Sequence, residues 1–233
     1  MLIKNFTLSI LFLSLFLTGC TKSKQARKVE KSGFIGDYSL LTKGKDDQAL
    51  FTYRKSEFGA KKYNKIIIDP AKIWTGKDSK LSKLEPKTRQ EIADNFNNYL
   101  VAEISKIMTV TKNPGLNTIR FQAAITDVDF SNPTLDIISS ILPYGLAISL
   151  AKEVATGKPS SVGESSIEIK VSDSMSGEII AAAVDKRVGS KRLDIDIFDK
   201  KADVDEILKY WAKFIAYKIC MSKELNKCID PKA

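Results

Sequence analysis

Acidic side chains are the groups with which this chain could most readily do chemistry, because its 233 residues contain no histidine. Without imidazole there is no Ser-His-Asp triad, and the commonest zinc ligand is missing. Two acidic runs have the spacing of paired carboxylates: Asp127 with Asp129, and Asp194, Asp196 with Asp199. Residues two apart share one face of a strand, so such a pair could bind calcium or supply the acid and base of a cell-wall glycan hydrolase. Neither run has the other ligands or the glycine of a calcium loop, so solvated strand ends explain both better.

A second set of side chains could contact a ligand or a partner: Asp37, Tyr38 and Asp173. The first two belong to SGFIGDYSLL at 32–41, where glycines and large apolar residues indicate a segment packed across the domain. We expect its apolar side chains and Tyr38 to fill a groove, while Asp37 caps a turn or pairs with a buried arginine. Asp173 precedes Ser174, and an Asx-type turn fits this pair better than a nucleophile beside its base. We therefore predict no catalytic residue, no cofactor and no metal site.

Cys20 is the one residue whose setting predicts a covalent modification. It follows a thirteen-residue apolar stretch at 6–18, which has the length of a signal peptide but is too short to cross a bilayer. The tetrapeptide 17–20, LTGC, resembles the lipobox of bacterial lipoproteins. By that resemblance residues 1–19 are a signal peptide, and Cys20 becomes the first residue and carries a diacylglyceryl group and an N-acyl chain such as palmitate. The alternative is a secretory signal that is cut elsewhere.

The residue after the cysteine bears on the membrane that receives the protein. Thr21 stands where an aspartate would retain a lipoprotein in the inner membrane. If the host has two membranes, we expect a lipid anchor on the periplasmic face of the outer membrane.

The other two cysteines, Cys220 and Cys228, form an even pair that suits an oxidising compartment. In one continuous helix their Cα atoms would be about 12 Å apart, too far for a disulfide. A bond between them requires the last helix to end first, and Asn226 is a residue that tolerates the left-handed conformation needed there. Two free thiols are the alternative.

The charge of the chain favours anionic surfaces over other partners. The net charge is +9, and cleavage before Cys20 would leave 214 residues at +8, because Lys4 is the only charged residue removed. In an envelope such a charge favours headgroups, acidic glycans or acidic proteins, and nucleic acid is excluded as a sensible partner. Residues 20–31 form a basic tether, which we expect to be solvated. A basic face that could bind anionic lipid or glycan would consist of Lys61, Lys62, Lys65, Lys186, Arg187, Lys191 and Arg192.

The remaining pattern predicts a single α/β domain over 32–233. Strands are expected at 63–70, 118–130, 167–171 and 178–187, and helices at 85–108 and from a capping box at Asp203 and Glu206 onwards. Residues 42–60 read as loop. The uncharged stretch 137–151, interrupted by a Pro-Tyr-Gly turn, reads as a buried helix, and a contact surface is the alternative. The predicted order is β-α-β-α-β-β-α, with a mixed, mostly antiparallel sheet of about four strands covered by helices.

Two motifs carry a resemblance to a known family. These are Gly-Phe-x-Gly-Asp-Tyr-Ser at 33–39 and Asp-Ser-x-x-Gly-Glu at 173–178, the latter followed by an alanine-rich strand and Asp185. With the tryptophan-bearing last helix, they resemble the uncharacterised bacterial lipoprotein family called domain of unknown function 3313. The resemblance covers nearly the whole chain after Cys20 and implies a lipoprotein with one α/β domain. It implies no reaction.

From these features we expect a non-enzymatic binding or assembly module of the cell envelope, held by lipid on the outer membrane and contacting an envelope protein. The alternatives are the carboxylate-dependent glycan hydrolase and the binder of anionic lipid or glycan. The sequence leaves the oligomeric state open.

Overall fold

The computed structural model describes residues 23–56, 59–76, 79–130, 162–189 and 201–232. Several features singled out in the sequence lie outside these ranges: Cys20, the uncharged stretch 137–151, the acidic run 194–199, Lys191 and Arg192. No helix among the described residues is long and apolar enough to cross a membrane.

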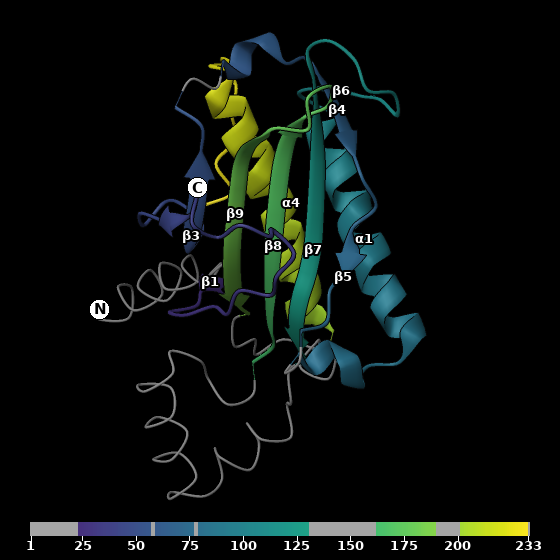
Figure 1. The fold of residues 1–233 in the computed structure, drawn as a ribbon. Coiled ribbons are helices and arrows are strands. Elements are labelled where there is room, and N and C mark those ends of the chain that lie inside the picture. Colours follow the sequence, from purple (N-terminus) through teal and green to yellow (C-terminus); the bar gives the residue numbers. More distant parts are fainter. Residues whose placement is uncertain (1–22, 57–58, 77–78, 131–161, 190–200, 233) are drawn as a thin grey trace, which may run out of the picture.

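A single mixed sheet of nine strands organises the described residues (Figure 1). The main path runs β2-β3-β9-β8-β7-β4-β6, while β1 adds to β9 and β5 adds to β7. The strands are β1 (Lys24–Gln25), β2 (Thr42–Lys43), β3 (Phe51–Arg54), β4 (Lys65–Ile68), β5 (Lys72–Ile73), β6 (Thr109–Val110), β7 (Thr118–Asp129), β8 (Glu164–Asp173) and β9 (Ile179–Val188). The helices are α1 (Pro86–Ile104) and α4 (Ala202–Ser222), with short 3-10 turns at Ala60–Lys62 and Lys80–Lys83.

The mixed α/β class is confirmed, but the expected strand number is wrong. The four predicted strands correspond to β4, β7, β8 and β9, and α1 and α4 match the two patterned helices. The other five strands are two to four residues long, too short to show a period of two. Two of them, β2 and β3, lie in the segment 42–60 that reads as loop. The predicted order is not confirmed, because its middle helix lies outside the described residues.

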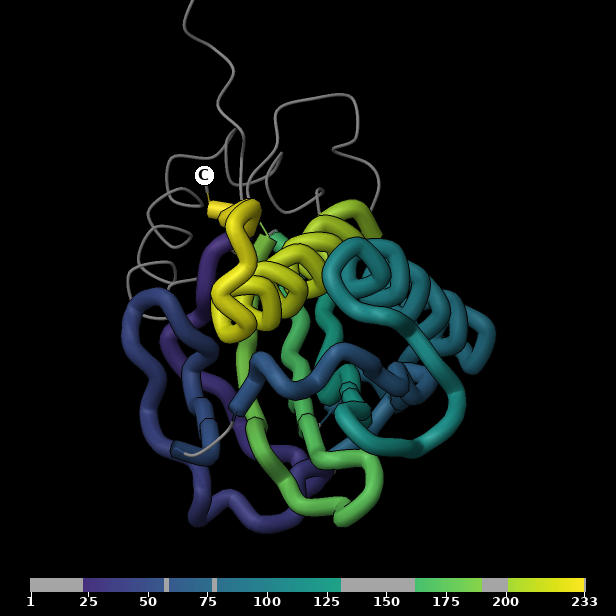
Figure 2. Tube along the Cα trace, turned by 90° about the horizontal axis from the view of Figure 1, so that it is seen from above, coloured from purple at the N-terminus to yellow at the C-terminus, as the bar shows by residue number. Residues whose placement is uncertain are grey.

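Helices α1 and α4 cover one face of the sheet side by side (Figure 2). Their apolar stripes pack on the alternating residues of β7 and β8, and Trp211 of α4 meets Phe96 of α1 edge to face at 6.4 Å between ring centroids. The fully buried residues of this core include Phe96, Leu100, Phe121, Ile125, Ile167, Ile207, Leu208 and Trp211. The hydrophobic effect of this two-layer packing is the main force that holds the helices on the sheet.

The N-terminal segment covers the opposite face of the sheet (Figure 2). Phe34 and Ile35 are buried there against Ala124, Ala182 and Val184 of β7 and β9. This second core covers the apolar side chains on the face of the sheet opposite α1 and α4.

Residues 24–25, which fall within the predicted tether, belong to the sheet, whereas the basic side chains of Lys24, Arg27, Lys28 and Lys31 are exposed. Ser23 is only 4% exposed, and the next two residues form β1 along β9, where Lys24 pairs with Val188. The buried Arg187 side chain donates hydrogen bonds to the Ser23 hydroxyl, at 3.0 Å, and to its carbonyl. The guanidinium also lies 3.6 Å from the centroid of the Tyr210 ring. The ordered domain therefore begins within three residues of Cys20.

The start of α4 also differs from the prediction. No capping box forms: the residue before the helix, Lys201, makes no side-chain cap, and Asp203 lies inside the first turn. The Asp203 carboxylate instead accepts a hydrogen bond of 2.8 Å from the backbone N–H of Gly163. A Cβ at Gly189 would come within 2.7 Å of this side chain, so only glycine fits there. A long-range contact to the sheet has replaced the local cap.

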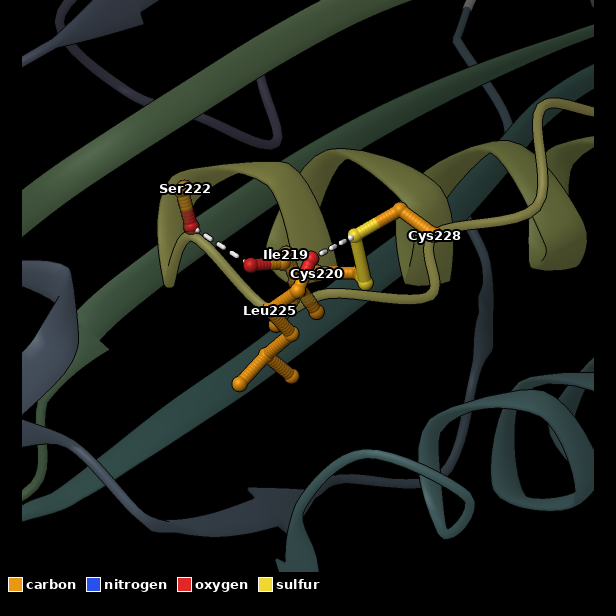
Figure 3. The surroundings of a disulfide bond; sticks show 5 residues. All are labelled: Ile219, Cys220, Ser222, Leu225 and Cys228. Carbon is orange, nitrogen blue, oxygen red and sulfur yellow. Dashed lines mark hydrogen bonds between the residues drawn. A yellow bond between two sulfur atoms is a disulfide. The ribbon is translucent and has the colours of Figure 1, made fainter.

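The C-terminal cysteines, Cys220 and Cys228, form a disulfide with Cα atoms 5.6 Å apart (Figure 3). The helix ends as the bond requires, but the left-handed residue is Glu224, at φ 54°, and not Asn226. The backbone N–H of Leu225 bonds the Cys220 carbonyl at 3.3 Å, and Glu224 N–H bonds the carbonyl three residues back. This pattern is a Schellman motif, which fixes the left-handed residue two positions after the last helical one whatever its type.

We expect the double variant Cys220→Ser/Cys228→Ser to lower the free energy of unfolding by about 2 kcal/mol, because the short covalent loop no longer restricts the unfolded chain. Denaturant unfolding followed by circular dichroism measures the difference. A reducing agent should destabilise the wild type to the same extent and leave the double variant unchanged. A wild type that is indifferent to reductant would contradict the bond.

Candidate functional site

The paired aspartates of β7 serve a structural contact. Asp127 accepts a hydrogen bond of 3.0 Å from the backbone N–H of Lys80, and Asp129 pairs with the Lys80 ammonium at 2.6 Å. Asp173 lies opposite Ile119, about eight residues along β7 from Asp127, which is roughly 26 Å. Paired carboxylates of a glycan hydrolase stand about 5 to 9 Å apart. Asp173 therefore lies too far from Asp127 to form such a pair, while Asp127 and Asp129 are both bonded to Lys80.

Asp173 organises the β8–β9 turn. One carboxylate oxygen accepts hydrogen bonds of 2.9 Å from the backbone N–H groups of Met175 and Ser176, and the other accepts one of 2.8 Å from the Tyr63 hydroxyl. The backbone bond from Ser176 is the main reason that the pKa of Asp173 is lowered. This is the Asx-type turn that the sequence favours, and Ser174 makes no contact with the carboxylate that would activate it as a nucleophile.

Asp37 and Tyr38 lie with the segment that covers the back of the sheet. Asp37 is exposed and accepts a hydrogen bond of 2.8 Å from the backbone N–H of Ser39, which closes a turn. The Ser39 side chain and then this backbone bond lower the pKa of Asp37. The Tyr38 hydroxyl donates to Glu168 at 2.5 Å and accepts from the backbone N–H of Gly33 at 2.6 Å. Both residues thus hold the segment in place.

Glu168 is a buried carboxylate that the sequence analysis missed. Its exposed fraction is 0%, and besides Tyr38 it accepts hydrogen bonds from the backbone N–H groups of Ser32 and Ile35. Gly33 and Gly36 bracket this contact with φ angles of +97° and +91°, which side chains disfavour. The glycines of the 33–39 motif therefore bend the chain around one carboxylate. The only hint of this buried carboxylate in the sequence is a glutamate between two isoleucines of a strand. In that pattern the glutamate usually lies on the solvent-exposed face of the strand.

The predicted basic face does not form. Lys65 pairs with Thr118 at the start of β7, whereas Lys186 lies level with Asp127, about 30 Å away along the sheet. Arg187 is buried between Ser23 and α4. The described members of the set thus belong to two ends of the molecule, and one of them is inside it.

Asp185 is a second buried carboxylate, on the face of β9 that meets α4. It accepts hydrogen bonds from the Trp211 indole at 2.8 Å, from the Gln25 amide at 2.7 Å and from the backbone N–H of Leu50 at 3.3 Å. Burial raises the pKa of Asp185, while these donors and the nearby Arg187 oppose that shift. The carboxylate therefore joins β1, the approach to β3, and α4 to one strand.

A cavity of about 410 Å³ opens beside this carboxylate, between α4, β9 and β3. We call it the α4 groove. Its floor includes Ile169 and Val171 of β8 and Ala181 and Ala183 of β9. Alternation along β9 places these two alanines on the same face as Asp185, toward the helix. Because alanine fills little space, the helix and the strand leave a gap where larger residues would have closed it.

The roof and mouth of the α4 groove differ in character. Trp211, Phe214, Ile215 and Ile219 of α4 form an apolar roof, while the charged lining residues are Arg54, Lys218, Lys223 and Asp185. A cavity of this size, mostly apolar with a few polar groups, is typical of small-molecule sites. No cluster of three or more potential metal ligands occurs among the residues that the structure describes. The arrangement suits binding of an apolar ligand more than acid-base chemistry.

The α4 groove was not predicted from the sequence. The run of alanines at 181–183 was its only signal, and it appeared there as a feature of a strand. Whether alanines leave a gap depends on what packs opposite them. Here that is α4, which follows these alanines by some thirty residues in the chain.

The comparisons with known proteins identify a family. The profile described as "Protein of unknown function (DUF3313)" matches residues 30–215. No match to a curated protein was found.

Among solved structures, the chain is similar to a PelC dodecamer from Paraburkholderia phytofirmans, at 11% identity and a TM-score of 0.39, over 76% of this chain and 98% of that one. It is also similar to a neuraminyllactose-binding hemagglutinin homologue from Helicobacter pylori, at 12% identity and a TM-score of 0.33, over 72% of this chain and 85% of that one. At such scores neither likeness bears on what this chain binds.

Burial, aided by the hydrogen bond to Asp173, raises the pKa of Tyr63 to about 12, whereas an unfolded tyrosine titrates near 10. The protonated hydroxyl therefore stabilises the fold fully below about pH 10, and this stability is lost as the pH rises through about 12. We expect tyrosinate absorbance of the native protein to show a step near pH 12 that Tyr63→Phe removes and the control Tyr217→Phe retains. A step that survives Tyr63→Phe would show that another tyrosine produces it.

We expect Asp185→Ala to lower the free energy of unfolding by about 3 kcal/mol or more, because three buried donors lose their acceptor. Denaturant unfolding followed by tryptophan fluorescence measures the loss. The matched control is Asp37→Ala, which removes an exposed carboxylate with one local hydrogen bond and should cost much less. Equal losses in the two variants would refute the central role of Asp185.

Proposed function

The chain belongs to the DUF3313 family of proteins of unknown function, and from that premise we propose that it is a non-enzymatic binding module of the cell envelope. In this proposal a lipid on Cys20 anchors it to the periplasmic face of the outer membrane, and the α4 groove is its binding site. The groove is the observation that carries the proposal, because it is a large apolar cavity in a domain whose paired aspartates on β7 are bonded to Lys80.

The burial of Ser23 supports the anchoring part of the proposal. Ser23 is buried and held by Arg187, and a chain of three residues spans at most about 11 Å. A lipid on Cys20 would therefore hold the domain directly at the bilayer surface, with the β1 end of the sheet nearest to it. A long flexible tether would have left the orientation of the domain undefined.

The disulfide supports a location in the periplasm, which is an oxidising compartment. Bonds such as Cys220–Cys228 persist in oxidising surroundings, which include the periplasm and exclude most of the cytosol. This agrees with the export that the lipobox-like LTGC sequence implies.

An envelope protein partner would find its contact at the other end of the sheet. Leu116 and Met175 are 82% and 65% exposed, and their loops are joined by a hydrogen bond of 3.1 Å from the Gly115 N–H to the Ser174 hydroxyl. Both loops lie at the end of β7 and β8 away from β1. Two exposed apolar side chains on connected loops, at the end of the sheet opposite β1, suit a contact across the periplasm.

The anchoring is tested by expressing the full precursor in a two-membrane host, with wild-type Cys20 and with Cys20→Ala. We expect the wild type to incorporate labelled palmitate and to fractionate with the outer membrane, and the variant to lose both properties, because the thiol is the attachment atom. Thr21→Asp is the matched control, which should keep the label and move to the inner membrane. If Cys20→Ala keeps the label and the location, the anchor is elsewhere and the proposal fails.

A further inference from the structure

We propose that the α4 groove binds a single-chain amphiphile with an anionic headgroup, of the chemical class of a free fatty acid. This inference rests on the proposed function, since it gives the binding module a class of ligand. The acyl chain would lie between α4 and the alanines of β9, and the headgroup would lie at the mouth of the groove.

The interior of the α4 groove determines the apolar part of this ligand. Ile169, Val171, Phe214 and Ile219 line it, and the alanines of β9 leave its floor open. Each methylene that moves from water onto such a surface should tighten binding by about fourfold. The volume of about 410 Å³ lies in the lower part of the usual range for ligand sites, about 300 to 1,000 Å³, which favours one acyl chain over two.

The mouth of the α4 groove determines the charge of the headgroup. Three of the four charged lining residues are cations, Arg54, Lys218 and Lys223. The fourth, Asp185, is buried in the wall with its oxygens already bonded to Trp211, to the Gln25 amide and to a backbone N–H. Lys218 bonds Asp47 at 3.0 Å, but both side chains reach solvent, so this pair can yield to a ligand. The net positive mouth favours a carboxylate and disfavours an ammonium headgroup.

Trp211 provides the measurement. The chain has two tryptophans, and only Trp211 lines the groove, so Trp74→Phe leaves one reporter in the site. Dodecanoate, dodecanol and dodecylammonium share one chain and differ in headgroup charge. Each is titrated below its micelle-forming concentration while Trp211 fluorescence is followed. We expect dodecanoate to bind at least about tenfold more tightly than dodecylammonium, and its affinity to fall as salt is added.

Two variants test whether the α4 groove is the site. Ala183→Leu fills the floor and should reduce dodecanoate affinity at least about tenfold, with thermal unfolding as the check of its fold; Ala181→Leu serves if the first variant unfolds. The matched control is Ala102→Leu, the same change at an exposed position of α1. Lys218→Gln should weaken the affinity for dodecanoate about three- to fivefold and leave the affinity for dodecanol unchanged. Lys213 is exposed on the same helix, and Lys213→Gln should change neither affinity.

Three outcomes would overturn the inference. Equal affinity for the three headgroups would remove the charge selectivity. Dodecanoate binding that is insensitive to Ala183→Leu and Ala181→Leu would place it outside the α4 groove. No fluorescence change with any of the three would mean that another occupant, such as a segment of this chain, fills the groove. None of these results touches the palmitate labelling of Cys20, so failure of the ligand class and failure of the anchoring proposal are distinguishable.

Discussion

The carboxylate of Asp185 is the interaction on which the rest of this structure depends. A buried carboxylate is costly unless donors replace its water, and here three donors do so. They come from the first strand, from the approach to the edge hairpin and from the last helix. One acceptor on β9 thus fixes three segments that lie far apart in the chain. Arg187, two residues later, extends the same arrangement to Ser23, and this contact holds β1 on the sheet.

Glu168, a second buried carboxylate, holds a distant segment on the opposite face of the sheet. Glu168 precedes Ile169 on β8 and lies one position from the partner of Asp185, Ile167, so the two acids point to opposite sides of neighbouring strands. Glu168 bends the segment around Ser32 and Tyr38 onto the back of the sheet, and Asp185 holds α4 on the front. Both acids therefore hold segments of the fold in place.

The α4 groove follows from this arrangement. Asp185 holds the start of the helical roof through Trp211, the disulfide closes the far end of the helix, and alanines lie beneath the part between them. Helix and strand are thereby fixed at a separation that small side chains do not fill. The groove runs along the helix, from Asp185 toward Lys223. In the proposed orientation, with a lipid on Cys20, such a site would be within reach of molecules that leave a bilayer.

Features that depend on neighbours along the chain could be predicted before the fold was known. Alternation gave β7 and the β8–β9 hairpin, the four-residue period gave α1, and the Asp173 turn followed from its own side chain, because each pattern is local. Only the tertiary structure decided what depends on distant partners. The short strands β1 and β3 form because the long strand β9 offers backbone groups with which they can pair. The Asp203 carboxylate does not cap α4 but accepts a hydrogen bond from the Gly163 N–H. Likewise, neither the burial of Glu168 and Asp185 nor the groove above the alanines has a local signature, because each is created by the segment that packs opposite.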